Sequence, residues 1–176
     1  MMDSQKKIKL KVNGREHCFT IGDGCGEIPA SETLVETIRE RLLLTGTKRP
    51  CNEGGCGGCT VLIDGKPSLS CSTLTSECDG KQITTIEGLE DPVTHELHPI
   101  QQAFIDLDAI QCGMCTPGIT LTAKALLDNN PDPTRQEVAE ALAGNICRCT
   151  GYEKYFDGIL LAAKRMRETA NNGKGE

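Results

Sequence analysis

Eleven cysteines occur in the 176 residues, and eight of them fall into two groups whose spacing suits metal binding. The first group is spaced C-x4-C-x2-C-x11-C and consists of Cys51, Cys56, Cys59 and Cys71. The second is spaced C-x2-C-x31-C-x1-C and consists of Cys112, Cys115, Cys147 and Cys149. Thiolates are soft ligands that suit zinc, copper(I) and iron–sulfur clusters, so the chain is expected to bind metal at two sites.

The first group has the spacing of plant-type [2Fe-2S] sites, in which three thiolates on one loop are joined by a distant fourth. Four glycines stand among these ligands, where a missing side chain lets the backbone approach a cluster closely: Gly54, Gly55, Gly57 and Gly58. The free amides of such a loop point at the sulfides and raise the reduction potential. Zinc is the alternative, but zinc ligands usually come as two closely spaced pairs, which this group lacks.

The second group places its cysteines at the ends of predicted helices. Cys112 and Cys115 precede a helix that starts at Thr116, and the other pair follows a later helix. The two pairs together would form a four-thiolate site at one end of a helical bundle. The spacing alone allows zinc or an iron–sulfur cluster, although C-x-C is unusual for zinc. The neighbouring first group favours electron transfer.

Composition and charge narrow the class of protein. Five aromatic residues (two Tyr, three Phe, no Trp) provide little material for an apolar core, so bound metal is expected to help hold the fold together. The N-terminus shows no export signal, which predicts a cytoplasmic protein with reduced thiols. The net charge of −6 includes no basic block, and no apolar run is long enough to span a membrane. Neither nucleic acid nor a membrane is therefore an expected partner.

The first half of the chain is predicted to be rich in β-strands. Strands are expected at residues 7–12, 19–21, 60–63 and 82–86. Asn13-Gly14 is a strong two-residue hairpin turn between the first two strands, and the third strand is expected to turn at Asp64-Gly65. Thr33 and Glu36 have the spacing of a capping box at the start of an amphipathic helix over residues 34–44.

The second half is predicted to be helical. Helices are expected over residues 99–109, 116–129, 134–143 and 153–168. Thr116-Pro117 and a capping box at Thr134 and Glu137 mark two of the starts. The acidic, proline-containing stretch before the first of these helices is typical of a linker. The chain is thus expected to divide into a domain at 6–88, a linker at 89–98, a helical domain at 99–168 and a flexible tail at 169–176.

The chain resembles the small iron–sulfur subunit of molybdenum hydroxylases, the xanthine dehydrogenase family, in the stretches that carry the second group: Gln111–Gly118 (QCGMCTPG) and Gly144–Tyr152 (GNICRCTGY). Further similar stretches are TGTK at 45–48, EGGCGGCTV at 53–61, TTIEGL at 84–89 and HPIQQAF at 98–104. The resemblance covers roughly residues 7–165. It is highly specific, because both four-cysteine patterns occur in order.

The resemblance implies an α+β chain, with an N-terminal β-grasp domain of the plant-type ferredoxin class followed by an all-α four-helix bundle. It implies a [2Fe-2S] cluster in each cysteine group, the second lying nearest a molybdopterin held by a separate large subunit. Electrons would pass from the molybdenum centre to this inner cluster, then to the outer cluster of the first group. An FAD subunit or an external acceptor such as a cytochrome would take them next. The chain would have no catalytic residue of its own, and the substrate pocket would lie on another chain.

The resemblance also singles out residues beside the ligands. Gln111 matches a glutamine that approaches the pterin in relatives, with an ordinary helix C-cap as the alternative. Arg148 lies between two ligands, where its charge could screen the cluster or face solvent. The chain departs from the family at residues 22–29, which look longer than usual, at Pro50, and at Gly58, where alanine is common. These departures leave the solvent exposure of the outer cluster open.

Three cysteines and two histidines remain unassigned. Cys18, Cys25 and Cys78 are expected to be small, partly buried residues rather than redox thiols. His95 and His98 lie in the predicted linker, where surface or packing roles are expected rather than metal binding. Two other functions stay open on the residues alone, namely an independent soluble ferredoxin and a zinc-stapled interaction module without a redox role.

Overall fold

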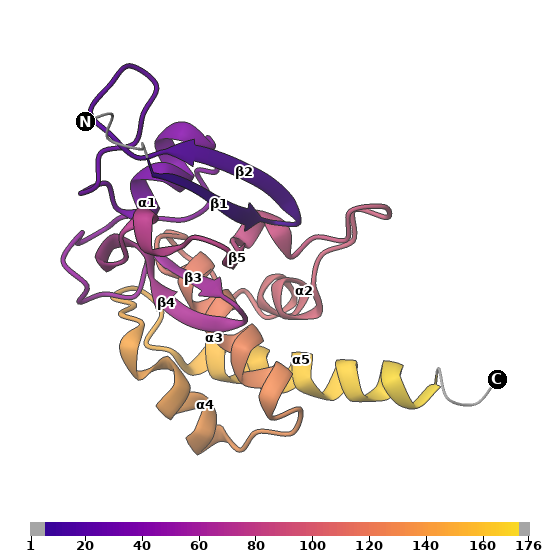
Figure 1. Cartoon of the computed structure of the whole chain (residues 1–176). Coiled ribbons are helices and arrows are strands. Elements are labelled where there is room, and N and C mark those ends of the chain that lie inside the picture. The colour runs from indigo at the N-terminus through magenta and orange to yellow at the C-terminus, as the bar shows by residue number, and fades with distance from the viewer. Residues whose placement is uncertain (1–5, 173–176) are drawn as a thin grey trace.

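The computed structural model describes residues 6–172 and shows an α+β chain in which a mixed sheet lies beside a group of helices (Figure 1). The strands are β1 (Lys7–Val12), β2 (Arg15–Thr20), β3 (Thr60–Ile63), β4 (Lys66–Leu69) and β5 (Gln82–Thr84). They are hydrogen-bonded in the order β2-β1-β5-β3-β4. β1 pairs with β5 in parallel, and the other neighbours are antiparallel.

Two tight hairpins build the two sides of the sheet. Asn13 and Gly14 join β1 to β2 with φ angles of 48° and 82°, and Asp64 and Gly65 join β3 to β4 with φ angles of 49° and 79°. Both central residues of such a turn need positive φ, which asparagine, aspartate and glycine tolerate. Local turn chemistry therefore fixes these hairpins, as predicted.

Two strands differ from their predicted bounds. β2 starts at Arg15 rather than near residue 19, because the two-residue turn lets Arg15 pair directly with Val12. The prediction missed this start because β2 lies at the edge of the sheet and its first residues are polar and mostly exposed. β5 ends at Thr84 rather than residue 86, because a 3-10 turn follows at Ile86–Gly88.

The helix predicted over residues 34–44 is short. α1 (Leu34–Glu36) continues as a wider π-helical turn at Thr37–Arg41, and Leu43 leaves the helical path with a φ angle of 57°. The predicted capping box is present. The Glu36 carboxylate accepts hydrogen bonds from the amide and the hydroxyl of Thr33, at 2.9 and 2.7 Å.

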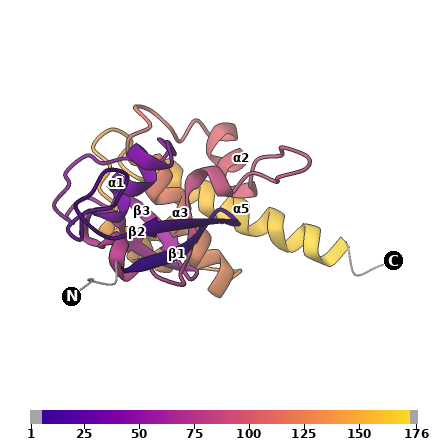
Figure 2. The same ribbon diagram turned by 45° about the horizontal axis from the view of Figure 1, so that its top comes forward.

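The second half contains α2 (Pro99–Asp106), α3 (Thr116–Asn129), α4 (Arg135–Ala141) and α5 (Glu153–Asn172). α3 has its predicted bounds, and the capping box between Thr134 and Glu137 is present at the start of α4. α5 extends past the body of the molecule, as Figure 2 shows. Residues 169–172 are thus helical rather than part of a tail, because the preceding residues are good helix formers. The remainder of the predicted tail lies outside the described residues.

Three of the four apolar clusters among residues 6–172 organise the packing of the sheet and the helices. One lies among the helices and includes Phe104, Ile119 and Tyr155. A second lies between the sheet and α1 and includes Ile8 and Ile38. The third joins the two regions, because Leu62 of β3 packs with Leu89 and with Leu121 and Ala125 of α3. Residues 89–98 contain no helix or strand, yet the regions on either side of them share this core. Within residues 6–172, no helix combines the length and apolar character needed to cross a membrane.

Candidate iron–sulfur sites

The first cysteine group is built on a loop between α1 and the sheet. Cys51, Cys56 and Cys59 lie on the irregular segment that leads into β3, and Cys71 lies in a 3-10 turn after β4. The thiols form two contacting pairs, Cys51 with Cys56 and Cys59 with Cys71. The hairpin of β3 and β4 therefore returns the distant fourth cysteine to the loop that carries the other three.

The two pairs of the first group differ in environment. Cys59 and Cys71 are buried, and burial raises the pKa of the Cys59 thiol to about 11. The Cys51 thiol lies at the surface and accepts a hydrogen bond from the Glu53 amide at 3.4 Å. This bond lowers the pKa of Cys51 to about 6, and hydrogen bonds to the Cys51 sulfur from the Cys56 thiol and from the Gly55 amide act in the same direction. Backbone amides that favour a thiolate are the donors expected of a loop that wraps an anionic cluster.

Three of the four glycines of this loop leave no room for a side chain, whereas a Cβ at Gly55 would meet nothing within 4 Å, so Gly55 is not required for close approach in this structure. A Cβ at Gly54 would lie 2.7 Å from the Ser72 hydroxyl, and one at Gly58 would lie 2.7 Å from the ring of Pro50. A Cβ at Gly57 would lie 2.3 Å from the Gly144 carbonyl oxygen. Gly57 therefore permits close contact with the helical region, which sequence reasoning did not anticipate.

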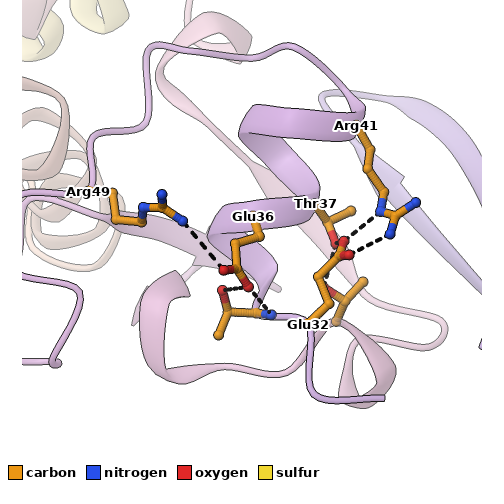
Figure 3. Close-up of polar contacts among 7 residues, drawn as sticks. Glu32, Glu36, Thr37, Arg41 and Arg49 are labelled. Atoms are coloured by element: carbon orange, nitrogen blue, oxygen red, sulfur yellow. Dashed lines mark hydrogen bonds and ion pairs between the residues drawn. The ribbon is translucent and has the colours of Figure 1, made fainter. Parts of the chain in front are cut away.

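A network of hydrogen bonds and ion pairs around α1 holds the segment that leads to Cys51 (Figure 3). Glu32 accepts two hydrogen bonds from the Arg41 guanidinium, at 2.7 and 2.6 Å, and one from the Thr37 hydroxyl at 2.6 Å. Burial acts to raise the pKa of Glu32, but the bonds from Arg41 and Thr37 outweigh it and hold the pKa below its usual range. Arg49 lies just before the first cysteine and contacts the capping glutamate of α1 at 3.5 Å. The start of α1 and the ligand loop are thereby tied together.

The second cysteine group gathers at the ends of helices. Cys112 lies on the loop after α2, Cys115 is the N-cap residue of α3, and Cys147 and Cys149 lie on the loop that follows α4 and a 3-10 turn. Again the thiols form two pairs. The sulfurs of Cys112 and Cys149 are 3.5 Å apart, and Cys115 contacts Cys147. Cys115 and Cys147 are buried, whereas Cys112 and Cys149 are exposed.

Hydroxyl groups surround the buried pair of this group. The Thr150 hydroxyl lies 3.2 Å from the Cys147 sulfur. The Tyr152 hydroxyl accepts a hydrogen bond from the Cys147 amide at 2.8 Å and donates one to the Asn145 carbonyl at 3.1 Å. The Tyr155 hydroxyl lies 3.7 Å from the Cys115 sulfur. Sequence reasoning missed these groups, and its one available signal was that both tyrosines follow closely on the last cysteine.

The two cysteine groups adjoin each other. A pocket of about 220 Å³ is lined by Cys56 and Gly58 from the first group and by all four cysteines of the second. The Ile146 amide donates a hydrogen bond to the Cys56 carbonyl at 2.9 Å. The buried side-chain amide of Asn145 donates another to the Gly57 carbonyl at 3.1 Å. The ligand loops of the two groups are therefore bonded directly to each other.

The donor sets fit two binuclear clusters. In a [2Fe-2S] cluster each iron takes two protein ligands, and each group presents two separate pairs of thiols. Among the described side chains, those of residues 6–171, no three His, Cys, Asp or Glu side chains converge on a point that would suit a single metal ion. Four thiols that meet in pairs are the donors that two iron atoms need.

Gln111 and Arg148 are both exposed and lie beside ligands of the second group. Gln111 is not a helix cap, because α2 ends at the cap residue Leu107. The helix-cap alternative is therefore wrong. The approach of Gln111 to a pterin stays a prediction. Arg148 lines the pocket between the two groups.

The remaining cysteines divide by burial. Cys78 is buried in the sheet core, as expected. Cys18 and Cys25 are exposed, so the expectation of partial burial is wrong for both. Cys18 lies on the edge strand β2, and Cys25 lies on an irregular loop, so neither has an element to cover it. His98 caps α2 by accepting a hydrogen bond from the Ile100 amide, a structural role.

Comparison with known proteins agrees with these sites. Residues 85–160 match the family described as [2Fe-2S] binding domain, and residues 33–111 match that described as 2Fe-2S iron-sulfur cluster binding domain. The chain is 44% identical over 154 residues to the nicotine 6-hydroxylase small subunit of Paenarthrobacter nicotinovorans, covering 88% of this chain and 87% of that protein. It is 45% identical over 158 residues to the nicotinate dehydrogenase small FeS subunit of Eubacterium barkeri, covering 90% and 95% respectively.

Solved structures show the same likeness. The chain superposes on quinoline 2-oxidoreductase from Pseudomonas putida 86 with a TM-score of 0.83 and 39% identity, covering 94% of this chain and 98% of that one. It superposes on the aldehyde oxidoreductase of Desulfovibrio gigas with a TM-score of 0.83 and 38% identity, covering 93% of this chain and 17% of that one. The chain therefore belongs to the family of small [2Fe-2S] iron–sulfur subunits of molybdenum hydroxylases.

Proposed function

We propose that the chain binds two [2Fe-2S] clusters and relays electrons from a molybdopterin site on a partner subunit to an acceptor. Cys51, Cys56, Cys59 and Cys71 hold the outer cluster. Cys112, Cys115, Cys147 and Cys149 hold the inner one. The observation that carries the proposal is the adjacency of the two groups, whose ligand loops are joined by the 2.9 Å bond between Ile146 and Cys56.

The chain's own residues would set how electrons pass. A bound [2Fe-2S] cluster accepts and releases one electron. The Ile146 amide and the Cys56 carbonyl give a short, hydrogen-bonded connection between a loop of each group. Asn145 and Gly57 hold these loops together from a buried position, which keeps the separation of the two sites fixed. Arg148 places a positive charge beside the inner ligands, where it would offset the negative charge of the bound cluster.

The exposed side of the second group is the proposed face toward the molybdopterin subunit. Cys112 and Cys149 are exposed there. Large apolar side chains beside them are also exposed, with Met114 at 48% and Ile146 at 58%. Gln111 lies on the same loop, where its amide would reach the pterin. The small subunits of nicotine 6-hydroxylase and nicotinate dehydrogenase align with this chain over 87% and 95% of their own lengths, which supports a contact made between subunits.

The finer architecture and the final acceptor belong to the same proposal. The sheet region corresponds to a β-grasp ferredoxin domain at 6–88, and the helical region to a four-helix bundle at 99–168. An FAD subunit or an external acceptor, such as a cytochrome, would approach the outer group. We place the assembly in the cytoplasm, where the eight ligand thiols stay reduced. The chain supplies no catalytic residue, and substrate choice rests with its partner.

Iron, acid-labile sulfide and zinc content test this proposal. Protein purified anaerobically with its natural partners should contain about four iron atoms and about four sulfides per copy of this chain, in addition to any iron of the partners. Zinc at one or two atoms per chain in place of iron would overturn it and favour a structural module.

A further inference from the structure

Tyr155 on the first turns of α5 lies beside the second cysteine group, and the function proposed above assigns it nothing. We propose that the Tyr155 hydroxyl donates a hydrogen bond to the sulfur of Cys115 and raises the reduction potential of the inner cluster. Tyr155 is then a residue that tunes the site without binding the metal. The inference rests on the proposed function, because it requires Cys115 to be a cluster ligand.

The geometry identifies which group is the donor. The Tyr155 hydroxyl lies 3.7 Å from the Cys115 sulfur and 2.8 Å from the Thr116 hydroxyl. A cysteine that binds iron has lost its proton, so between sulfur and phenol only the phenol can donate. The Thr116 hydroxyl can then donate to the phenol oxygen. The three groups form a directed chain of hydrogen bonds that ends on the sulfur.

Packing fixes the hydroxyl in place. The Tyr155 side chain is 0% exposed, and its ring meets Phe104 edge to face, with centroids 4.9 Å apart. A Cβ at Gly158 would lie 2.6 Å from the Phe104 ring, so this glycine lets α5 approach α2 closely. Bulk solvent does not reach this buried side chain, and hydrogen bonds in such surroundings are electrostatically stronger than in water.

The direction of the effect follows from charge. Reduction adds a negative charge to a cluster that is already anionic, and a hydrogen bond to a ligand sulfur stabilises that added charge. The outer group offers a contrasting pair, because Ser72 also lies 3.7 Å from a ligand sulfur, that of Cys71, but is exposed. Water can replace the serine hydroxyl there, whereas bulk solvent does not reach the buried Tyr155 hydroxyl.

Tyr155→Phe in the intact complex tests the inference, because it removes the hydroxyl and keeps the ring. In a redox titration followed by EPR, the inner cluster's reduction equilibrium should shift about threefold to tenfold toward the oxidised state, equivalent to about 30–60 mV at 59 mV per decade. The outer cluster's potential should stay unchanged in the same sample. Thr116→Val, which removes the upstream donor, should shift the inner potential in the same direction and by less.

Each contrary outcome has a distinct meaning. An unchanged inner potential in Tyr155→Phe protein with full iron content would overturn the inference and leave the proposed function intact. Equal shifts of both clusters, or loss of inner iron in Tyr155→Phe with no shift in Thr116→Val, would also overturn it in favour of a packing role. A wild-type protein without two EPR signals would instead refute the proposed function itself.

Discussion

The two cysteine groups are assembled by different means. The outer group takes three cysteines from one short loop, so most of its geometry is local, and only Cys71 must be brought in by a hairpin. The inner group takes two cysteines from each of two loops that are separated by the whole of α3 and α4. Its geometry is therefore set by helix packing. Local chemistry should control the outer site, and the helical core should control the inner one.

Removing one ligand from either group should have the largest effect. Cys71→Ser should remove the outer cluster and Cys115→Ser the inner one, each lowering this chain's iron content by about half. Cys78→Ser is the matched control, because Cys78 is a buried cysteine outside both groups. Iron analysis with EPR distinguishes the variants. Loss of the same signal in both ligand variants would contradict the assignment of two sites.

The second-largest effect is expected when the helical core is opened, because this change should affect the inner group more than the outer group. Phe104→Ala should lower the free energy of unfolding by about 3–5 kcal/mol, because it leaves a cavity beside Tyr155. The inner cluster should then be lost faster than the outer one on exposure to a chelator, as followed by visible absorbance and EPR. Ile8→Val in the sheet core is the milder counterpart, at about 0.5–1.5 kcal/mol, and should spare the inner site. Equal rates of loss in Phe104→Ala would show that packing does not set the difference.

Separating the ligand loops should affect both groups at once. Gly57→Ala introduces a side chain at a φ angle of 69°, 2.3 Å from the Gly144 carbonyl, and should destabilise both clusters. Gly65→Ala has a similar φ angle of 79° but open space around it. The control should therefore show only the backbone cost, about 1–2 kcal/mol. Chemical denaturation compares the two, and equal losses would mean that the contact between the loops contributes nothing.

The smallest expected change in stability comes from the network around α1, which includes Glu32 and Arg41. Glu32→Gln should lower the free energy of unfolding by about 1–2 kcal/mol near neutral pH, because it weakens the two bonds from Arg41. The folded-state pKa of Glu32 is lowered, so its contribution is present above the unfolded pKa of 4.5 and is lost as the pH falls through the folded value.

The difference between wild type and Glu32→Gln should therefore shrink as the pH falls below about 4.5, the unfolded pKa. Glu40→Gln, at an exposed position of the same helical turn, is the matched control and should change the free energy of unfolding little near neutral pH. Urea denaturation at several pH values measures both variants. A pH-independent loss in Glu32→Gln would show that the carboxylate charge is not responsible.

Local signals in the sequence predicted much of the fold. The turn residues at 13–14 and 64–65 and the two capping boxes predicted hairpins and helix starts, because each depends on chemistry within four residues. α5 and β2 were predicted too short, because an exposed end carries no apolar period to mark it. Within the candidate sites, spacing predicted the two groups of cysteines that the structure brings together. It did not identify Tyr155 or the Asn145–Gly57 bond, which depend on how distant segments pack.

The central claim is that one chain holds two different [2Fe-2S] clusters side by side. A reductive titration of the anaerobically purified complex, followed by low-temperature EPR, tests it most directly. We predict two distinct signals from this chain, each about one spin per chain, with different potentials and with mutual broadening when both are reduced. A single signal, or none together with stoichiometric zinc, would contradict the two-cluster relay.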